Sequence, residues 1–364
     1  MSITGNIGEW SEVYAFLKIL GDEKLFAGNE SLEKLEGVVY PVIKILREES
    51  AGKFEYSINR NVVFITHDGR ELLRLPISEF AQKAKETLEK IIENKKQKNT
   101  TFSIPEIEAF MAAIYCKSLK ASSREKTDII IVIHDERTNQ QPMLGFSIKS
   151  QIGSASTLLN SSKATNFRFK VDGLASSDIK KINNIQNPKK ILNRIAKITE
   201  LGGELTFNKV VSDTFSNNLV LIDSLLPQII GHILLSYFTS SISKVKDLVE
   251  QLELSNPMNF DNKQKHLFYT YKIKRLLTDI AVGLLMPTKV WSGKYDATGG
   301  YLVVKNDGDI LCYHLYNKNE FEDYLFFNTK LDTASTSKHS FGELYEDELG
   351  DVYLNLNLQI RFLK

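Results

Sequence analysis

The stretch Thr127 to Gln151, TDIIIVIHDERTNQQPMLGFSIKSQ, predicts two short strands joined by a polar turn. Residues 128–134 are mostly β-branched and apolar, as in a buried strand. Residues 135–142 are rich in Asp, Asn, Gln and Pro, which suits a turn. Residues 143–151 alternate, so one face carries Leu144, Phe146 and Ile148 and the other carries Gly145, Ser147, Lys149 and Gln151. An acid, Asp128, therefore begins the first strand, and a lysine lies on the polar face of the second.

An aspartate and a lysine placed in this way resemble the core of the PD-(D/E)xK nucleases. A phosphodiester is anionic, so its hydrolysis needs a hard cation, and Mg²⁺ takes oxygen ligands that usually include one or two carboxylates. We expect Asp128 to bind Mg²⁺ and Lys149 to position the attacking water and balance charge in the transition state. The usual second acid is missing, because Ser147 stands two residues before the lysine; we expect Ser147 to hold a water on the metal. The alternative is a buried hairpin with a solvated edge.

A glutamate from a helix can compensate for Ser147, as the helix ahead of the catalytic hairpin often does in PD-(D/E)xK enzymes. Ser103-Ile-Pro-Glu-Ile-Glu predicts a helix start, with Ser103 as N-cap, Pro105 in the first turn and the helix running to about Leu119. Glu106 suits a capping box, so Glu108 is the preferred metal ligand. Glu9 and Glu12, beside the apolar stripe of a helix over 9–20, are further candidates, although solvated or capping roles explain them as well.

Several linked blocks of sequence resemble the HpaII family of type II restriction endonucleases. They span nearly the whole chain: 5–12 (GNIGEWSE), 145–153 (GFSIKSQIG), 156–160 (STLLN), 165–167 (TNF), 298–301 (TGGY), 328–330 (NTK) and 354–362 (LNLNLQIRF). The resemblance implies sequence-specific hydrolysis of double-stranded DNA at CCGG or a related short palindrome, leaving 5′-phosphate ends. It also implies a restriction-modification system, in which a cognate DNA methyltransferase protects the host. A two-fold target favours a homodimer, although a monomer is compatible with the same target.

Composition excludes several classes of protein. The 364 residues carry 46 Lys+Arg against 45 Asp+Glu, a net charge of +1, so a DNA-binding face has to come from local clustering. Two cysteines, Cys116 and Cys312, suggest free thiols in a reducing compartment. The start, MSITGNIGEW, carries no signal-peptide pattern. The most apolar run, 219–238, is interrupted by polar residues and predicts a buried helix, so we expect a cytoplasmic protein without a membrane segment.

The remaining elements follow from periodicity and turn residues. We expect a helix over 31–49 interrupted at Pro41, strands over 54–65 and 71–76 around the hairpin turn His67-Asp-Gly69, and a long helix over 78–96. A strand is expected over 165–171, helical residues over 178–201 with a break near Pro188, and packed helices over 220–242 and 263–285. From Thr298 the chain turns to β-structure, and 353–362 is expected to form one strand with Gln359 and Arg361 on one face.

Polar and basic residues supply candidate contacts to DNA. Arg is a suitable bidentate reader of guanine, amides and hydroxyls pair with base edges or phosphates, and small residues let backbone amides approach a phosphate. Lys117, Lys120 and Arg124 add positive charge just before Asp128, and six cations between Lys180 and Lys197 are expected to line a DNA channel or a solvated helix face. The specific DNA-binding candidates are Gln151, Ser156, Thr157, Asn160, Asn166, Lys330, Ser337, Lys338, His339 and Arg361.

These observations predict an α/β, restriction-endonuclease-like fold with a mixed central sheet flanked by helices. We expect an N-terminal α+β lobe over 1–99, the catalytic core over 100–215, and a helical and β-rich C-terminal lobe for DNA recognition over 216–364. The alternative function is a catalytically inactive or less specific DNA-binding or repair protein of the same fold, which Ser147 keeps open.

Overall fold

The computed structural model describes residues 3–120, 127–136, 138–283 and 286–364. Within them the chain is a mixed α/β protein with eleven α-helices and three sheets. It divides into two compact units. Unit 1 comprises the described residues of Met1–Ser156 and Tyr295–Tyr324, together with Lys364, and unit 2 comprises those of Thr157–Lys294 and Leu325–Leu363. The boundaries expected at 99/100 and 215/216 fall inside unit 1 and unit 2, respectively.

Unit 1 is built on a nine-stranded mixed sheet with the order β1-β12-β11-β7-β6-β2-β3-β4-β5. Two pairings, β1–β12 and β11–β7, are parallel, and the others are antiparallel. The strands are β1 (Lys24–Gly28), β2 (Lys34–Glu49), β3 (Gly52–Asn59), β4 (Val62–His67), β5 (Arg70–Pro76), β6 (Ile129–Ile133), β7 (Met143–Ser150), β11 (Gly300–Val304) and β12 (Ile310–His314). The predicted hairpin around Asp68-Gly69 is confirmed as β4–β5.

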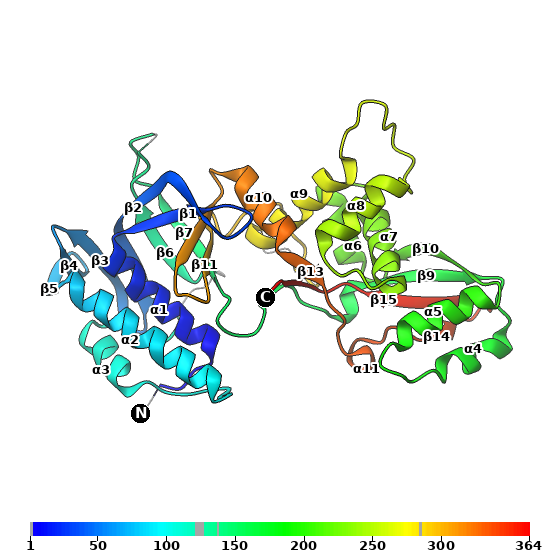
Figure 1. The fold of residues 1–364 in the computed structure, drawn as a ribbon, viewed down its shortest axis with the longest axis horizontal. Coiled ribbons are helices and arrows are strands. Elements are labelled where there is room, and N and C mark those ends of the chain that lie inside the picture. Colours follow the sequence, from blue (N-terminus) through cyan, green and yellow to red (C-terminus); the bar gives the residue numbers. More distant parts are fainter. Residues whose placement is uncertain (1–2, 121–126, 137, 284–285) are drawn as a thin grey trace. The chain divides into compact units, whose positions relative to one another are not determined.

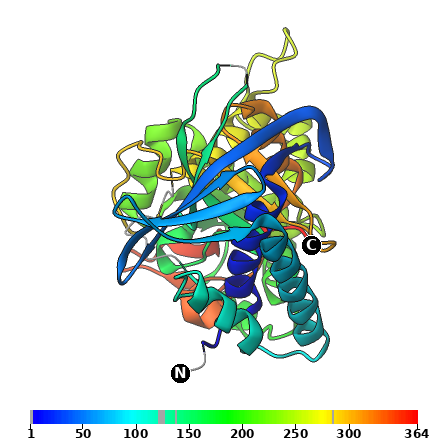
Figure 2. The same ribbon diagram turned by 90° about the vertical axis from the view of Figure 1, so that its left-hand side faces the viewer.

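Helices α1 (Ile7–Asp22) and α2 (Ile77–Lys96) lie side by side against this sheet (Figures 1 and 2). Nine residues of α1 are buried, and they lie on all sides of the helix rather than on one stripe. The helix begins with a capping box, in which Asn6 and Glu9 each accept a backbone hydrogen bond from the other. The predicted helices over 9–20 and 78–96 are therefore confirmed, and α1 lies within the core of unit 1.

The predicted central hairpin is confirmed as β6 and β7, which pair antiparallel with Ile129 opposite Phe146 and Ile131 opposite Leu144. Leu144, Phe146 and Ile148 are buried, as the alternation predicts. Strand β7 is covered on its other edge by β11, with Tyr301 opposite Ser147 and Val303 opposite Lys149. The hairpin is thus central in its sheet, and its polar positions are held by strands on both sides.

Unit 2 contains a four-stranded sheet, β10-β9-β15-β14, and a three-stranded sheet, β13-β16-β8. The strands are β8 (Thr157–Leu159), β9 (Asn166–Asp172), β10 (Glu204–Val210), β13 (Thr329–Leu331), β14 (Leu344–Glu346), β15 (Val352–Asn357) and β16 (Ile360–Phe362). Its helices are α4 (Ser176–Asn183), α5 (Lys190–Glu200), α6 (Asp213–Ile222), α7 (Leu226–Thr239), α8 (Val245–Ser255), α9 (Phe268–Val282) and the short α11 (Thr336–His339). The break between α4 and α5 contains Pro188, as predicted.

Five predictions about elements are wrong. The expected strand over 54–65 is two antiparallel strands, β3 and β4, and the expected helix over 220–242 is divided between α6 and α7 by a 107° bend. The expected helix over 31–49 is the 16-residue strand β2, because this segment pairs with β1, β3 and β6, and the sheet overrides its local helical spacing. The helix around Glu106 is α3 (Pro105–Ala113); its N-cap is Ile104 rather than Ser103, without a side-chain cap bond, and it ends before Leu119. The expected strand over 353–362 is two strands, β15 and β16, in different sheets.

Both cysteines are free and buried, as predicted. Helix α10 (Lys318–Phe327) crosses the division between the units. Among the described residues, no single helix is long and apolar enough to cross a membrane, and one helix pair, α6 and α7, meets the length and composition criteria only when its two members are taken together across a 107° bend.

Gly300 lies where the central sheet leaves no room for a side chain. Its φ is +97°, and a Cβ there would overlap the Tyr313 carbonyl oxygen. We expect Gly300→Ala to lower the free energy of unfolding by about 2–5 kcal/mol, since left-handed strain and overpacking add. Gly69→Ala is the matched control, with a φ of +76° and open space at the Cβ position, and should cost about 1–2 kcal/mol. Urea denaturation of both variants measures the difference, and equal losses would contradict the predicted clash.

Candidate active site

The structure brings Asp128, Ser147 and Lys149 together at one end of the β6–β7 hairpin. Asp128 immediately precedes β6, and its Oδ2 accepts hydrogen bonds from the backbone N–H of Ile148 at 2.7 Å and from the Ser147 hydroxyl at 3.0 Å. The Lys149 Nζ donates to Ser147 Oγ at 2.9 Å and lies 4.9 Å from the Tyr301 ring centroid. Ser147 therefore bridges the lysine and the aspartate, in the position that an acid occupies in the usual motif.

Helix α1 supplies a second carboxylate, Glu12. Burial first, and the negative charge of Asp128 second, raise the pKa of Glu12 to about 8, although Lys120 and Arg47 oppose the shift. The two carboxyl groups therefore lie within range of each other's charge. The next residue back, Ser11, is buried, and its hydroxyl is hydrogen-bonded to Ser150 Oγ at 2.9 Å, which ties α1 to the end of β7.

The other three candidate glutamates have different partners. Glu9 closes the capping box and forms an ion pair with Lys120, with 3.2 Å between its Oε1 and the lysine Nζ. Glu108 lies on α3, where its Oε2 accepts a hydrogen bond from the backbone of Ile3 at 2.8 Å. Glu106 lies in the first turn of the same helix. Electrostatic coupling to Asp128 is therefore documented for Glu12, and the structure favours Glu12 over Glu108 as its companion.

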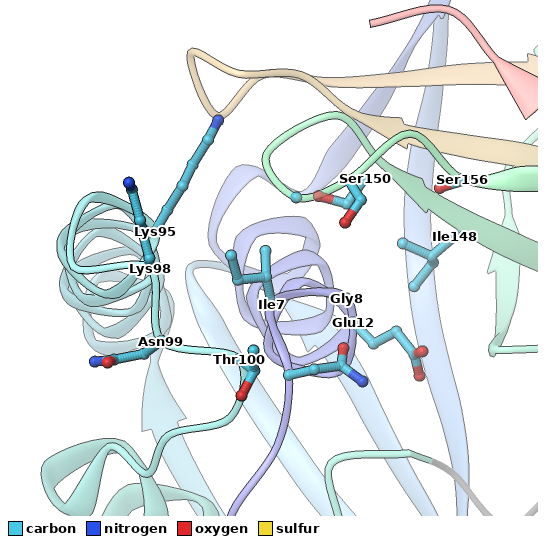
Figure 3. Close-up of a pocket in the computed structure, with 13 residues that line it drawn as sticks. Ile7, Gly8, Glu12, Lys95, Lys98, Asn99, Thr100, Ile148, Ser150 and Ser156 are labelled. Carbon is cyan, nitrogen blue, oxygen red and sulfur yellow. The ribbon is translucent and has the colours of Figure 1, made fainter. Parts of the chain in front are cut away.

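Glu12 is part of the lining of a polar cavity of about 520 Å³ (Figure 3). Glu12, Ile148 and Ser150 form the side nearest the hairpin, and the start of α1 forms another side. The remaining lining comes from the end of α2, the segment after it and the loop after β7, and consists of Lys95, Lys98, Asn99, Thr100, Gly153, Ser154 and Ser156. Hydroxyls, amides and two ammonium groups thus surround a space large enough for a sugar-phosphate unit.

The donor set fits a hard divalent cation better than a soft one. Within the described residues, no group of three or more His, Cys, Asp and Glu side chains is arranged to hold a metal. Two carboxylates, Asp128 and Glu12, with a hydroxyl at Ser147 are nevertheless the oxygen ligands that Mg²⁺ uses, because it retains several waters. A closed zinc site needs four nitrogen or sulfur ligands, which the site lacks among its described residues.

Three of the predicted DNA contacts form one row of paired residues in unit 2. In the three-stranded sheet, Arg361 of β16 pairs with Lys330 of β13 on one side and, at a register shift, with Thr157 of β8 on the other. Lys330 and Arg361 are directly opposite, and such residues project from the same face. Arg361 also forms an ion pair with Asp332, with 3.1 Å between Nη1 and Oδ2. Two half-exposed cations therefore stand together on one sheet face, and Thr157 follows next to them across the sheet.

The other predicted DNA contacts are more dispersed. Asn166 is buried, and its amide is held by the carbonyl of His339 at 2.9 Å and by the Asn357 amide at 2.7 Å, which gives it a structural role. The His339 ring lies 3.3 Å from Ser161 Oγ. Ser337 and Lys338 lie with His339 on α11, Asn160 is exposed after β8, and Gln151 and Ser156 follow β7 in unit 1.

The structure treats two of the predicted arginines, Arg194 and Arg124, differently from the other basic candidates. Arg194 is one of the six cations expected to line a DNA channel, but it is fully buried and donates to the Gly342 and Asn183 carbonyls, so that expectation is wrong for this residue. Arg124 lies outside the described residues, whereas Lys120 is described and reaches Glu9. The sequence alone leaves Glu12 as one of four candidate glutamates. The feature that could have singled it out is its place, next to Ser11, in a helix whose other faces are apolar.

Comparisons with known proteins identify the class. The model of the family described as "HpaII restriction endonuclease" matches residues 6–362. The chain is 47% identical over 362 residues, which cover 99% of each sequence, to the type II restriction enzyme HpaII of Haemophilus parainfluenzae. No solved structure matches the chain.

The class is therefore that of the type II restriction endonucleases, site-specific deoxyribonucleases that act on double-stranded DNA and generally use divalent metal ions. This chain belongs to the HpaII restriction endonuclease family. The predicted resemblance, enzyme class and nuclease function are thereby confirmed.

The carboxylate pair makes stability depend on pH. A Glu12 pKa of about 8 in the folded protein lies above its ordinary value of 4.5, so the folded state binds the extra proton between these values and stability falls as pH rises. Below pH 4.5 both states are protonated and the effect vanishes. We expect Glu12→Gln to melt at a higher temperature than the wild type at pH 8.5 in EDTA, and at nearly the same temperature at pH 4.

Glu9→Gln is the matched control, because glutamine preserves the capping box. Burial acts to raise the pKa of Glu9, but hydrogen bonds from the Asn6 backbone and Lys120 outweigh it and lower that pKa. The Glu9 variant should therefore gain no stability at high pH. Thermal melting at both pH values measures the effect; a Glu12→Gln advantage independent of pH would contradict the raised pKa of Glu12.

Proposed function

We propose that this protein cleaves double-stranded DNA in a Mg²⁺-dependent reaction at CCGG or a closely related short palindrome, leaving 5′-phosphate and 3′-hydroxyl ends. The observation that carries the proposal is the pair of Asp128 and Lys149, joined through Ser147 at the end of a central hairpin, with Glu12 of α1 in the lining of the neighbouring cavity. The family match supports DNA as the substrate, and CCGG rests on the resemblance in sequence to the HpaII family. We also infer that unit 1 has the PD-(D/E)xK fold.

In the proposed site, Asp128 and Glu12 hold the cation, and Glu12 takes the part assigned from the sequence to Glu108. A bound divalent cation supplies neutralisation of the scissile phosphate and a lower pKa for water at the site. The Lys149 ammonium, steered by Ser147, is placed to orient the attacking water and stabilise charge that develops on the phosphate. The Ile148 N–H fixes Asp128 Oδ2, so the carboxylate is oriented before substrate arrives.

We infer that the sugar-phosphate backbone enters the polar cavity beside Glu12. Lys95 and Lys98 offer positive charge there, and Thr100, Ser154 and Ser156 offer hydroxyls to phosphate oxygens. A cavity lined by hydroxyls and ammonium groups favours an anionic polymer over an apolar ligand.

For recognition of bases we propose the row of Thr157, Arg361 and Lys330 in unit 2, with Ser337, Lys338 and His339 of α11, and with Gln151 and Asn160 as further contacts. Arginine pairs bidentately with guanine, and lysine also reaches its O6 and N7. Asp332 holds the Arg361 guanidinium in one orientation, which favours a defined reading direction. A palindromic target has two-fold symmetry, so we propose a homodimer on DNA and a cognate methyltransferase that protects the host sites.

The reaction is tested by digesting a fully sequenced plasmid with Mg²⁺ and with EDTA, and then mapping the ends. We expect discrete cuts at one short motif in Mg²⁺, 5′-phosphate ends, and no cutting in EDTA. A smear in place of fragments would support a less specific nuclease. An uncut plasmid that nevertheless shows a sequence-specific gel shift would support an inactive binding protein.

The residue roles are tested by four alanine variants. Asp128→Ala, Glu12→Ala and Lys149→Ala should each lower the single-turnover cleavage rate by about a hundredfold or more, while specific DNA binding persists. The first two remove a proposed ligand of the cation, and the third removes the positive charge beside the reacting phosphate. Glu108→Ala is the control and should cut at nearly the wild-type rate. Loss of cleavage in Glu108→Ala, with retention in Glu12→Ala, would reverse the assignment of the second acid.

A further inference from the structure

A buried ion pair lies behind the proposed metal site. Arg47 and Glu49 of β2 are 6% and 5% exposed, and Arg47 Nε donates to Glu49 Oε1 at 2.6 Å. Both side chains occupy the face of β2 that is buried in unit 1, two positions apart in the strand. Taking two opposite charges out of water has a large desolvation cost, so a buried pair is weak evidence for stability and calls for another explanation.

The pair is the centre of a network that reaches the segment leading to Asp128. The Arg47 Nη2 donates to the carbonyl of Ser118. The Ser118 hydroxyl lies 2.9 Å from Glu49 Oε2 and 2.6 Å from the carbonyl of Lys120, and its one proton is donated to one or the other of these acceptors. Lys120 is the last described residue before 127, and its ammonium pairs with Glu9 of α1. The network thus joins β2, the segment after α3 and the start of α1.

The same guanidinium also faces α1. The Arg47 Cζ lies 5.6 Å from the centroid of the Phe16 ring, one helical turn beyond Glu12. Glu9, Glu12 and Phe16 share one face of α1, where Lys120 contacts Glu9 and Arg47 contacts Phe16, so the two cations lie on either side of Glu12 along that face. Of these two cations, Lys120 has a side chain that is 58% exposed and therefore screened, whereas Arg47 is buried and held in place on two sides.

We propose that Arg47 is a positioning residue of the nuclease site, which holds a fixed positive charge behind Glu12 and orients that carboxylate towards Asp128 for a divalent cation. Glu49 and Ser118 fix the guanidinium by hydrogen bonds that a lysine cannot make simultaneously. Arg47 itself touches neither metal nor DNA in this scheme. The inference rests on the proposed function, since it assigns a support to the carboxylate pair proposed there.

The test is calorimetric titration of Mn²⁺, a probe for the divalent site, into the full-length protein without DNA. Outer supports of metal ligands typically contribute 10–100-fold in metal affinity. We expect Arg47→Met to bind Mn²⁺ about tenfold or more weakly than the wild type, and Arg47→Lys to be intermediate because it keeps the charge. Asp128→Ala defines the signal of the site and should remove it.

Arg194→Met is the matched control. Arg194 is an equally buried arginine with carbonyl partners, but it belongs to unit 2, so its loss should destabilise the fold without changing Mn²⁺ affinity. Thermal melting of each variant establishes that the protein titrated is folded. If Arg47→Met does not fold, Arg47→Lys decides, with an expected loss of about threefold or more because its ammonium cannot fork between Glu49 and Ser118.

If a folded Arg47→Met protein binds Mn²⁺ with wild-type affinity, the positioning role is overturned and the proposed function still stands. The same conclusion follows from wild-type affinity in Arg47→Lys where only that variant folds. A wild-type protein that neither binds Mn²⁺ at the position removed by Asp128→Ala nor cuts DNA in Mg²⁺ overturns the proposed function, and this inference with it. Weaker binding in the Arg47 variants, with unchanged binding in Arg194→Met, supports the inference.

Discussion

The candidate site depends on a buried carboxyl group, Glu12, whose charged form is disfavoured by its surroundings. Burial alone disfavours a charged Glu12, and Asp128 adds a like charge within range of it. Such an arrangement persists only if the surrounding elements hold it, and they do so by firm contacts. Ser11 ties α1 to Ser150, the capping box fixes the start of α1, and the Ile148 N–H holds Asp128. The proposed cation would relieve the repulsion, which explains why a folded protein retains an unfavourable pair.

The sequence predicts those elements whose signal is local. The β6–β7 hairpin has β-branched residues, a polar turn and strict alternation within 25 positions, and it forms as expected. Strand β2 is the counterexample, because its 34–49 segment has charges at helical spacing. It nevertheless pairs with its sequence neighbours β1 and β3 and with β6, which lies far along the chain. The end of the chain fails for a related reason, since the irregular pair Leu358-Gln359 divides it between two sheets.

The candidate site also contains residues that local sequence predicts and one residue that it does not. Asp128, Ser147 and Lys149 are neighbours by strand pairing, so a motif reading can place them together, and their hydrogen bonds agree with that reading. Glu12 is more than a hundred residues away in sequence, and nothing local distinguishes it from Glu9, which is used to cap the same helix. The same holds in unit 2. Thr157, Lys330 and Arg361 are separate predictions from positions far apart in the sequence, and the pairing of three strands brings them into one row.

When the second acid comes from a helix and not from the hairpin, different contacts set the spacing of the proposed metal ligands. In the usual motif both acids and the lysine lie on one hairpin, so their spacing follows from strand geometry. Here a neutral hydroxyl occupies the strand position, and the second charge depends on how α1 packs against the sheet. The separation of the carboxylates is then set by tertiary contacts, which respond to any change in the core around Trp10 and Phe16. In the proposed site, catalysis would therefore depend on core packing as well as on the hairpin, and the buried network of Arg47 and Glu49 beside α1 is the support that we propose for it.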